Sequence, residues 1–249
     1  MIGSTEPEVP EFNLTTNTTG NGIALGAFLG MKAVAPDSYE SLASTLESQD
    51  AASLLPEGTH STIVEGYAKQ LEIYARAMRD NSISFLECML GSSPSCSPQN
   101  VHPVSRGTVS LNASDPEGEV VVDYRAGSNP VDIDITVELV KFFRRYMTTG
   151  DLEVYGAEEV TPGAEVVTDE ELAEWARQQI IPSVFHPVGT AAKMPKEWGG
   201  VVDEELLVYG VEGLSVVDAS IMPTLVGSTT SMTVYAIAEK VSFPSPMAN

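Results

Sequence analysis

The feature that most constrains the fold is a long amphipathic helix pattern near the first third of the chain. Between residues 61 and 80, apolar side chains recur at steps of three or four, which places them on one helix face: Ile63, Tyr67, Leu71, Tyr74 and Met78. A helix with one apolar face must bury that face against other elements. The segment 82–90 that follows reads as a strand. The chain is therefore expected to pack helices against a sheet.

The rest of the chain alternates in the same way. The first 36 residues are rich in Thr, Asn, Gly and Pro and are expected to form a loop with little regular structure. Thr168 and Glu171 form a capping-box pattern at the start of one further helix. Helices are expected at 38–48, 131–147, 168–180 and 231–240, a pair of strands within 107–124, and a buried strand at 214–218. Helices mixed with short, separated strands predict an α+β fold.

Charge excludes some partners. The formal net charge is −22 and the sequence pI is about 4.3. Such a surface repels phosphates and anionic lipids, so we expect neither nucleic-acid nor membrane binding. No apolar run is long enough for a transmembrane helix. The first twelve residues lack the basic and apolar regions of a signal peptide, which leaves the localisation open.

Two features point to an oxidising compartment without establishing it. Cys88 and Cys96 are separated by Gly, Ser and Pro, and they could close a disulfide loop or remain two thiols. Asn13, Asn17 and Asn112 begin glycosylation sequons, which also arise by chance. Two cysteines alone are too few for a zinc site, and no metal is expected.

Chemistry is concentrated between residues 181 and 240. His186 stands in a turn-like segment that Pro187 and Gly189 tighten. A histidine fixed on such a loop can act as a base near neutral pH; the alternative is a structural histidine. Asp218 ends an expected strand, where α/β proteins place ligands, although it could equally be a turn acid.

These segments carry a family resemblance. HPVGTAAKMP, GVVDEELLVYGVEGLSVVDASIMP and VYAIAEK together resemble the C-terminal signature of glucose–methanol–choline (GMC) oxidoreductases, most closely fungal members of the aryl-alcohol oxidase and choline dehydrogenase type. Upstream, HPVSRGTVSLNASDP resembles the family's His-Pro-x-Ser-Arg-Gly strand. The resemblance is strong from His102 onward and weak before it. Several long motifs in the family's order make a chance match improbable.

The resemblance implies FAD as cofactor and hydride transfer from a small-molecule alcohol to the flavin. His186 matches the histidine that takes the hydroxyl proton. Asp218 and Ala219 match the strand end that contacts the FAD phosphate and ribityl region. Thr230 and Ser231 match the place where backbone amides approach the flavin ring, and such amides stabilise negative charge on the reduced flavin.

The same match implies structural roles for His102 and Arg106. It also implies that the full-length relatives could be secreted glycoproteins.

The sequence departs from the family pattern in three places. The second active-site residue, usually His or Asn, falls on Thr229 when counted back from Val234, and threonine is a poor base. No G-x-G-x-x-G fingerprint follows a strand near the N-terminus, so weak FAD binding or none is expected from this chain alone. VSFPSPMAN ends a helix that the family continues. These departures lead us to expect a truncated form with altered termini.

The expected architecture is a substrate domain at 1–175, with an antiparallel sheet backed by helices, followed by a return segment of the FAD-binding domain at 176–249. The leading interpretation is an FAD-dependent oxidoreductase acting on CH–OH groups. The alternative is a non-enzymatic remnant or binding module that keeps the substrate-domain fold. Substrate identity and the choice between oxidase and dehydrogenase are not readable from these residues.

Overall fold

The computed structural model of the chain describes residues 23–91 and 98–242, and its elements follow an α+β order. The α+β prediction is confirmed. The strands are β1 (Ile23–Leu29), β2 (Leu86–Gly91), β3 (Pro98–Asn100), β4 (Thr108–Ser110) and β5 (Val121–Asp123). The helices are α1 (Met31–Val34), α2 (Tyr39–Ser48), α3 (Ser61–Met78), α4 (Pro130–Met147), α5 (Asp169–Gln179) and α6 (Ser231–Ser242). Short 3-10 turns are η1 (Ala51–Leu54), η2 (Gly150–Tyr155), η3 (Lys196–Trp198) and η4 (Ala219–Ile221).

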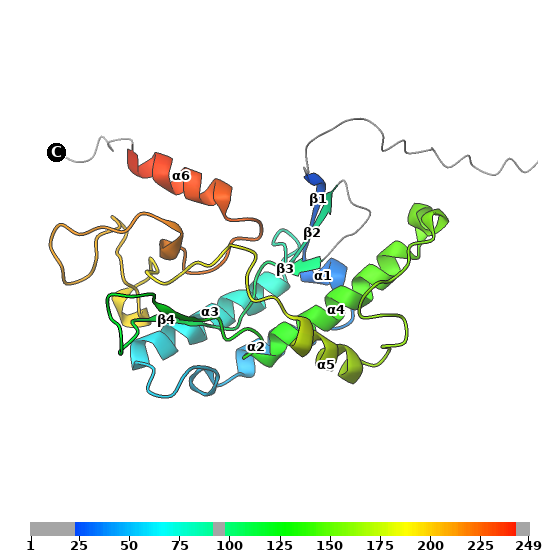
Figure 1. The fold of residues 1–249 in the computed structure, drawn as a ribbon, viewed down its shortest axis with the longest axis horizontal. Helices are drawn as coiled ribbons and strands as arrows, with labels where there is room; N and C mark the ends of the chain where they lie inside the picture. The colour runs from blue at the N-terminus through cyan, green and yellow to red at the C-terminus, as the bar shows by residue number, and fades with distance from the viewer. Residues whose placement is uncertain (1–22, 92–97, 243–249) are drawn as a thin grey trace, which may run out of the picture.

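Two small antiparallel sheets are present. The first has the order β1-β2-β3, with Phe28 opposite Glu87 and Leu86 opposite Asn100. The second is the β4–β5 hairpin, in which Val109 pairs with Val122. The two strands predicted within 107–124 and the strand predicted at 82–90 are therefore confirmed. The first sheet sits close to one end of α3, and the C-terminal segment runs along that helix (Figure 1).

Local sequence explains where the long helices begin. The Asn129 side chain accepts a hydrogen bond from the Val131 N–H, and Pro130 occupies the first turn of α4, where its missing N–H costs nothing. At α5 both halves of the predicted capping box are present: Thr168 accepts from the Glu171 N–H, and Glu171 accepts from the Thr168 N–H. The four helices predicted in the sequence between 38 and 180 all form.

The main core lies between α2, α3, α4 and the first sheet. The apolar face predicted for α3 supplies Tyr67, Leu71, Tyr74 and Met78 to it, while Ile63 stays partly exposed. A separate cluster in the C-terminal part of the chain joins Val202, Leu206 and Ile221, with Ile237 of α6 packed against it. Because this cluster is small, polar contacts with α3 must contribute to holding the C-terminal segment in place.

Two secondary-structure predictions are wrong. Residues 23–29 were expected to be loop but form β1, because β2 offers them a hydrogen-bonding edge. Residues 214–218 were expected to be a strand but make only an isolated bridge from Ser215 to Leu207. Within the described residues no second strand lies beside this segment, so its hydrogen bonding stops at the contacts with 206–208.

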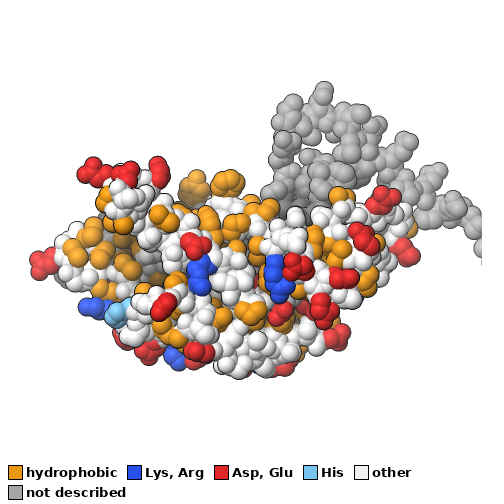
Figure 2. All heavy atoms as spheres, turned by 60° about the horizontal axis from the view of Figure 1, so that its bottom comes forward, with side chains coloured by type: hydrophobic (Ala, Val, Ile, Leu, Met, Phe, Trp, Pro, Cys, Tyr) orange, Lys and Arg blue, Asp and Glu red, His pale blue; other side chains and the backbone are white. Residues whose placement is uncertain are grey.

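Acidic side chains are scattered over the face seen in Figure 2, with apolar side chains between them, in keeping with the net charge of −22. No helix in the described part of the chain is long and apolar enough to cross a membrane. Cys88 is buried and disulfide-bonded, whereas Cys96, Asn13, Asn17 and the proline-containing ending lie outside the described residues. Asn112 is partly exposed, and its side chain accepts hydrogen bonds from Ser114.

Candidate functional site

The predicted base sits on a strained loop. Phe185, immediately before His186, has a φ of 62° and is 96% exposed. A positive φ is unusual for a bulky residue, and such conformations cluster at sites where the surrounding structure enforces them. Gly189, three residues after His186, has a φ of 88°, which glycine adopts without a side-chain clash. The loop therefore turns sharply on both sides of His186.

The His186 ring is held by one residue, Thr230. Its Nδ1 lies 2.8 Å from the Thr230 Oγ1 and 3.4 Å from the Thr230 backbone nitrogen. In the longer contact the Thr230 backbone N–H donates to Nδ1, which requires an unprotonated Nδ1, whereas the hydroxyl can donate or accept and suits either neutral tautomer. The other ring nitrogen, Nε2, makes no hydrogen bond among the described residues. Nε2 is therefore the ring nitrogen left for a contact with a bound group.

Thr230 also marks the start of α6. Its carbonyl accepts the first helical hydrogen bond, from the Val234 N–H at 3.0 Å, and Thr230 is 6% exposed. The N–H groups of the first turn, beginning at Ser231, consequently have no acceptor within the helix. Together with the helix dipole they favour an electron-rich group at this end. The predicted residues Thr230 and Ser231 thus lie at the His186 side of α6.

Asp218 caps the short turn η4. Its Oδ1 accepts from the Ser220 N–H at 2.8 Å and from the Ser220 hydroxyl at 2.5 Å. This turn is fastened to the loop after His186, because Ala191 N–H donates to the Ser220 carbonyl at 3.0 Å and Lys193 N–H donates to the Ile221 carbonyl at 2.8 Å. The structure therefore places the Asp218–Ala219 turn and the segment that follows His186 side by side.

Thr229 makes no contact of this kind. Within the described residues its carbonyl accepts a hydrogen bond from the Ser228 hydroxyl at 3.3 Å, and no hydrogen bond joins it to His186. The hydroxyl beside the histidine belongs to Thr230. The start of α6 distinguishes the two threonines, because Thr230 is the residue just before the first helical position, Ser231.

Sequence reasoning missed one acidic residue near the site. Glu87 on β2 is 1% exposed, and its Oε1 has no hydrogen-bond partner among the described residues. Burial raises the pKa of Glu87, and the charge of His186 opposes this shift. A carboxyl group in the apolar stretch FLECML was the signal that could have revealed it.

His102 and Arg106, expected to be structural, both contact side chains of α3, and His102 is buried whereas Arg106 is partly buried. The His102 ring packs against Tyr74 at 5.6 Å and Phe85 at 5.0 Å between ring centroids. Burial lowers the pKa of His102 to about 4, with a backbone hydrogen bond to Leu225 opposing the shift, so the ring is neutral at pH 7. The Arg106 guanidinium donates to the Gln70 side chain. Neither residue contacts His186 in the described structure.

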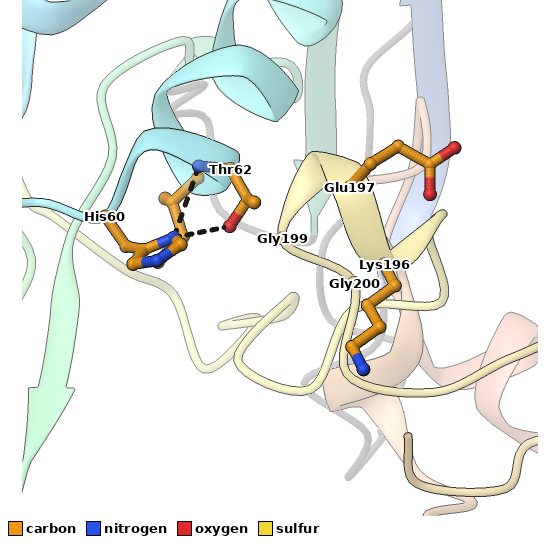
Figure 3. A pocket seen from close by; sticks show the side chains of 7 residues that line it. His60, Thr62, Lys196, Glu197, Gly199 and Gly200 are labelled. Carbon is orange, nitrogen blue, oxygen red and sulfur yellow. Dashed lines mark hydrogen bonds between the residues drawn. The ribbon is translucent and has the colours of Figure 1, made fainter. Parts of the chain in front are cut away.

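A depression lies away from these residues. It has a volume of about 550 Å³ and is open to solvent. Figure 3 shows His60 turned toward Thr62 at the start of α3, across from Lys196 and Glu197. None of the predicted site residues lines it. Among the described residues, no group of three or more His, Cys, Asp or Glu side chains is placed to hold a metal ion.

The site residues fit part of a flavin. The N–H groups at the start of α6 have no acceptor within the helix and suit an electron-rich ring edge, and Thr230 at this end contacts His186 Nδ1. The described residues would therefore fit the ring end of FAD.

Comparison with known proteins shows the family of the chain. A family model described as GMC oxidoreductase matches residues 103–238. Dehydrogenase xptC of Emericella nidulans is 34% identical over 87% of this chain and 35% of its own length. Glucose oxidase 1 of Penicillium expansum is 31% identical over 84% of this chain and 34% of its own length.

Solved structures show the same relation. A fungal aryl-alcohol oxidase superposes with a TM-score of 0.82 at 38% identity, covering 87% of this chain and 37% of its own. An FAD-dependent oxidoreductase from Chaetomium thermophilum gives a TM-score of 0.83 at 32% identity, again over 87% of this chain and 37% of its own. The resemblance drawn from the sequence motifs is thereby confirmed. The chain spans about a third of the length of these relatives.

Proposed function

Because the chain belongs to the GMC oxidoreductase family, we propose that it carries the proton-accepting part of an FAD-dependent site that oxidises CH–OH groups of a small-molecule alcohol. Membership of the family supports FAD-dependent oxidation of alcohols and sugars in general. His186 is the proposed base. The proposal includes neither a nucleic-acid nor a membrane partner, because the acidic surface disfavours both.

The contact between His186 and Thr230 is the single observation that carries this proposal. The proposal requires the tautomer with its proton on Nδ1, in which Nδ1–H donates to the Thr230 hydroxyl 2.8 Å away and gives up the longer contact from the Thr230 backbone N–H. In that tautomer Nε2 has the lone pair that takes a proton from an alcohol. Thr230 is thus proposed to orient the ring.

FAD, when bound, would supply the acceptor for the hydride that leaves the carbinol carbon. The backbone N–H groups that begin at Ser231 would stabilise negative charge next to them. The Asp218–Ala219 turn is the proposed contact for the phosphate and ribityl region. Thr229 is kept only as a hydrogen-bonding residue of the same loop, since no described contact joins it to His186.

The test measures the anaerobic reduction of added FAD by alcohols in the presence of the protein. The loss of the flavin absorption reports the reduction. Aryl alcohols, choline and glucose form the first panel, because relatives of this chain carry the names of oxidases or dehydrogenases for these compounds. His186→Asn should slow reduction by about 10²–10⁴-fold, the usual contribution of a general base. Thr230→Val should reduce the rate less and shift its pH profile.

His60→Asn is the matched control, because His60 lines the separate depression and its ring is hydrogen-bonded to Thr62. Unchanged flavin reduction in this variant, with loss in His186→Asn, would support the assignment. Equal rates in His186→Asn and the parent chain would refute it.

The alternative proposal is a non-enzymatic binding module that keeps the substrate-domain fold. Titration of FAD, read by quenching of flavin fluorescence, separates the two proposals. Protein that leaves flavin fluorescence unchanged at every concentration favours the binding module.

A further inference from the structure

One stripe of α3 faces the C-terminal segment. Gly66, Gln70 and Tyr74 follow each other at steps of four residues and therefore lie on one side of the helix. At Gly66 the Trp198 carbonyl approaches so closely that a Cβ would lie 2.0 Å from its oxygen. Glycine is therefore required there for the two backbones to meet. The stripe seats the segment that leads to the candidate site.

Gln70 fixes this segment with its side-chain amide. It is 5% exposed, and its Nε2 donates to the Pro223 carbonyl at 2.6 Å. Its Oε1 accepts from the Arg106 guanidinium, which determines which end of the amide faces Pro223. The buried Gln70 side chain, held by Arg106, thus presents one donor to a carbonyl 153 positions further along the chain.

The next contacts follow at alternate residues of the same loop. The Leu225 backbone is hydrogen-bonded to His102 and Tyr74, and the Gly227 carbonyl accepts from the Ser84 hydroxyl at 2.5 Å. Residues 223, 225 and 227 are therefore each hydrogen-bonded to a side chain of α3 or of the segments beside the first sheet.

The close approach at Gly227 strengthens this picture. A Cβ there would lie 2.6 Å from the Ser84 hydroxyl oxygen and 3.4 Å from the His102 Nε2. Three residues later, Thr230 meets His186. The distance along the loop from Gly227 to Thr230 is short, so a displacement at Gly227 moves the Thr230 hydroxyl relative to the histidine ring.

We infer that Gln70 and Ser84 are positioning residues, which anchor the loop 223–227 so that Thr230 is held against His186. The inference rests on the proposed function only where it names His186 as the residue whose ring the anchored loop keeps in contact with Thr230. The anchoring itself is a property of this chain's own side chains. It also assigns a structural role to the His-Pro-x-Ser-Arg-Gly motif. His102 contacts the anchored loop directly, and Arg106 contacts it through Gln70.

The test compares Ser84→Ala and Gln70→Glu with the parent 249-residue chain. Gln70→Glu keeps an acceptor for Arg106 but replaces the donor to Pro223 with an oxygen. Hydrogen–deuterium exchange of the peptide covering 223–231 should accelerate about 2–10-fold for each variant, the range expected from one lost hydrogen bond. The ¹⁵N signals of the His186 ring should also shift, because its hydrogen bond to Thr230 changes.

Two controls separate anchoring from general destabilisation. Lys69→Ala alters the residue next to Gln70 and breaks only the exposed pair with Glu72, so both readouts should stay at parent values. Ser84→Thr keeps the hydroxyl and should restore both. Exchange rates and His186 ring signals that match the parent chain in Ser84→Ala and Gln70→Glu would overturn the inference. Exchange that accelerates in α2 and α4 as much as in the peptide 223–231 would overturn it too. Neither readout needs flavin, so failure of the proposed function would be seen separately, as absent flavin reduction.

Discussion

Replacing Asp132 with asparagine should destabilise the fold strongly. Asp132 is 3% exposed, and each of its two oxygens accepts one backbone N–H: Val104 to Oδ1 at 2.8 Å and Ser105 to Oδ2 at 2.7 Å. Asparagine offers only one oxygen, so one of these N–H groups would face an NH₂ group and lose its acceptor. The Val104–Ser105 segment would come loose from the start of α4.

The magnitude follows from those two contacts. Burial raises the pKa of Asp132, and hydrogen bonds from Ser105 and Val104 oppose that shift, so the magnitude is taken from the lost hydrogen bond alone. A buried backbone N–H left without an acceptor costs about 1–3 kcal/mol in the free energy of unfolding. For a chain of this size that corresponds to a fall in Tm of roughly 2–12 °C.

Urea unfolding followed by circular dichroism at pH 7 measures the loss, and thermal scans supply the Tm. Asp134→Asn is the control, because Asp134 lies two residues along the same helix, is exposed and accepts no hydrogen bond within the described structure. A decrease below about 1 kcal/mol in Asp132→Asn would refute the two-acceptor reasoning. An equal decrease in both variants would mean that loss of a negative charge near the start of α4, and not loss of a hydrogen bond, lowers the free energy of unfolding.

Three further changes test other parts of the fold. Glu87→Gln should raise stability at pH 7 by about 1 kcal/mol, because burial raises the pKa of the unpartnered carboxyl and folding opposes its ionisation. The gain should vanish as pH falls below 4.5, where the unfolded carboxyl is protonated too; a gain independent of pH in urea unfolding would contradict this. Thr168→Ala should cost about 1 kcal/mol by removing the α5 cap, measured in the same way, and an unchanged midpoint would argue against the capping box. Leu139→Ala, at a 2% exposed core position, should cost about 2–5 kcal/mol; a smaller loss would mean that the core collapses around the cavity.

Sequence reasoning succeeded where the information is local. The positions of α3 and α5 follow from apolar spacing and from the Thr168–Glu171 cap, which involve residues a few places apart. It failed at β1, because the partner strand β2 lies about sixty residues further along and the pairing leaves no local pattern. The failed strand at 214–218 has the same origin, since a strand exists only where another strand accepts its hydrogen bonds.

The candidate site divides in the same way. His186 was named from the motif around it and Asp218 from the resemblance, and the roles given to them stay predictions. That Thr230 and not Thr229 lies against His186 depends on the residue at which α6 begins, and helix ends are the least certain part of a sequence-based assignment. Glu87 and Gln70 were not identified, because each acts on a residue about 100–150 positions away.

The stripe of Gly66, Gln70 and Tyr74 on α3 also determines where this chain can change length during evolution. One residue inserted between Gly66 and Tyr74 would rotate everything beyond it by about 100° around the helix axis, so Gln70 and Tyr74 could no longer face the segment they hold. Insertions in the exposed turn between β4 and β5 would disturb no such alignment. We therefore expect homologues to vary in the hairpin loop and to keep a fixed residue count along α3.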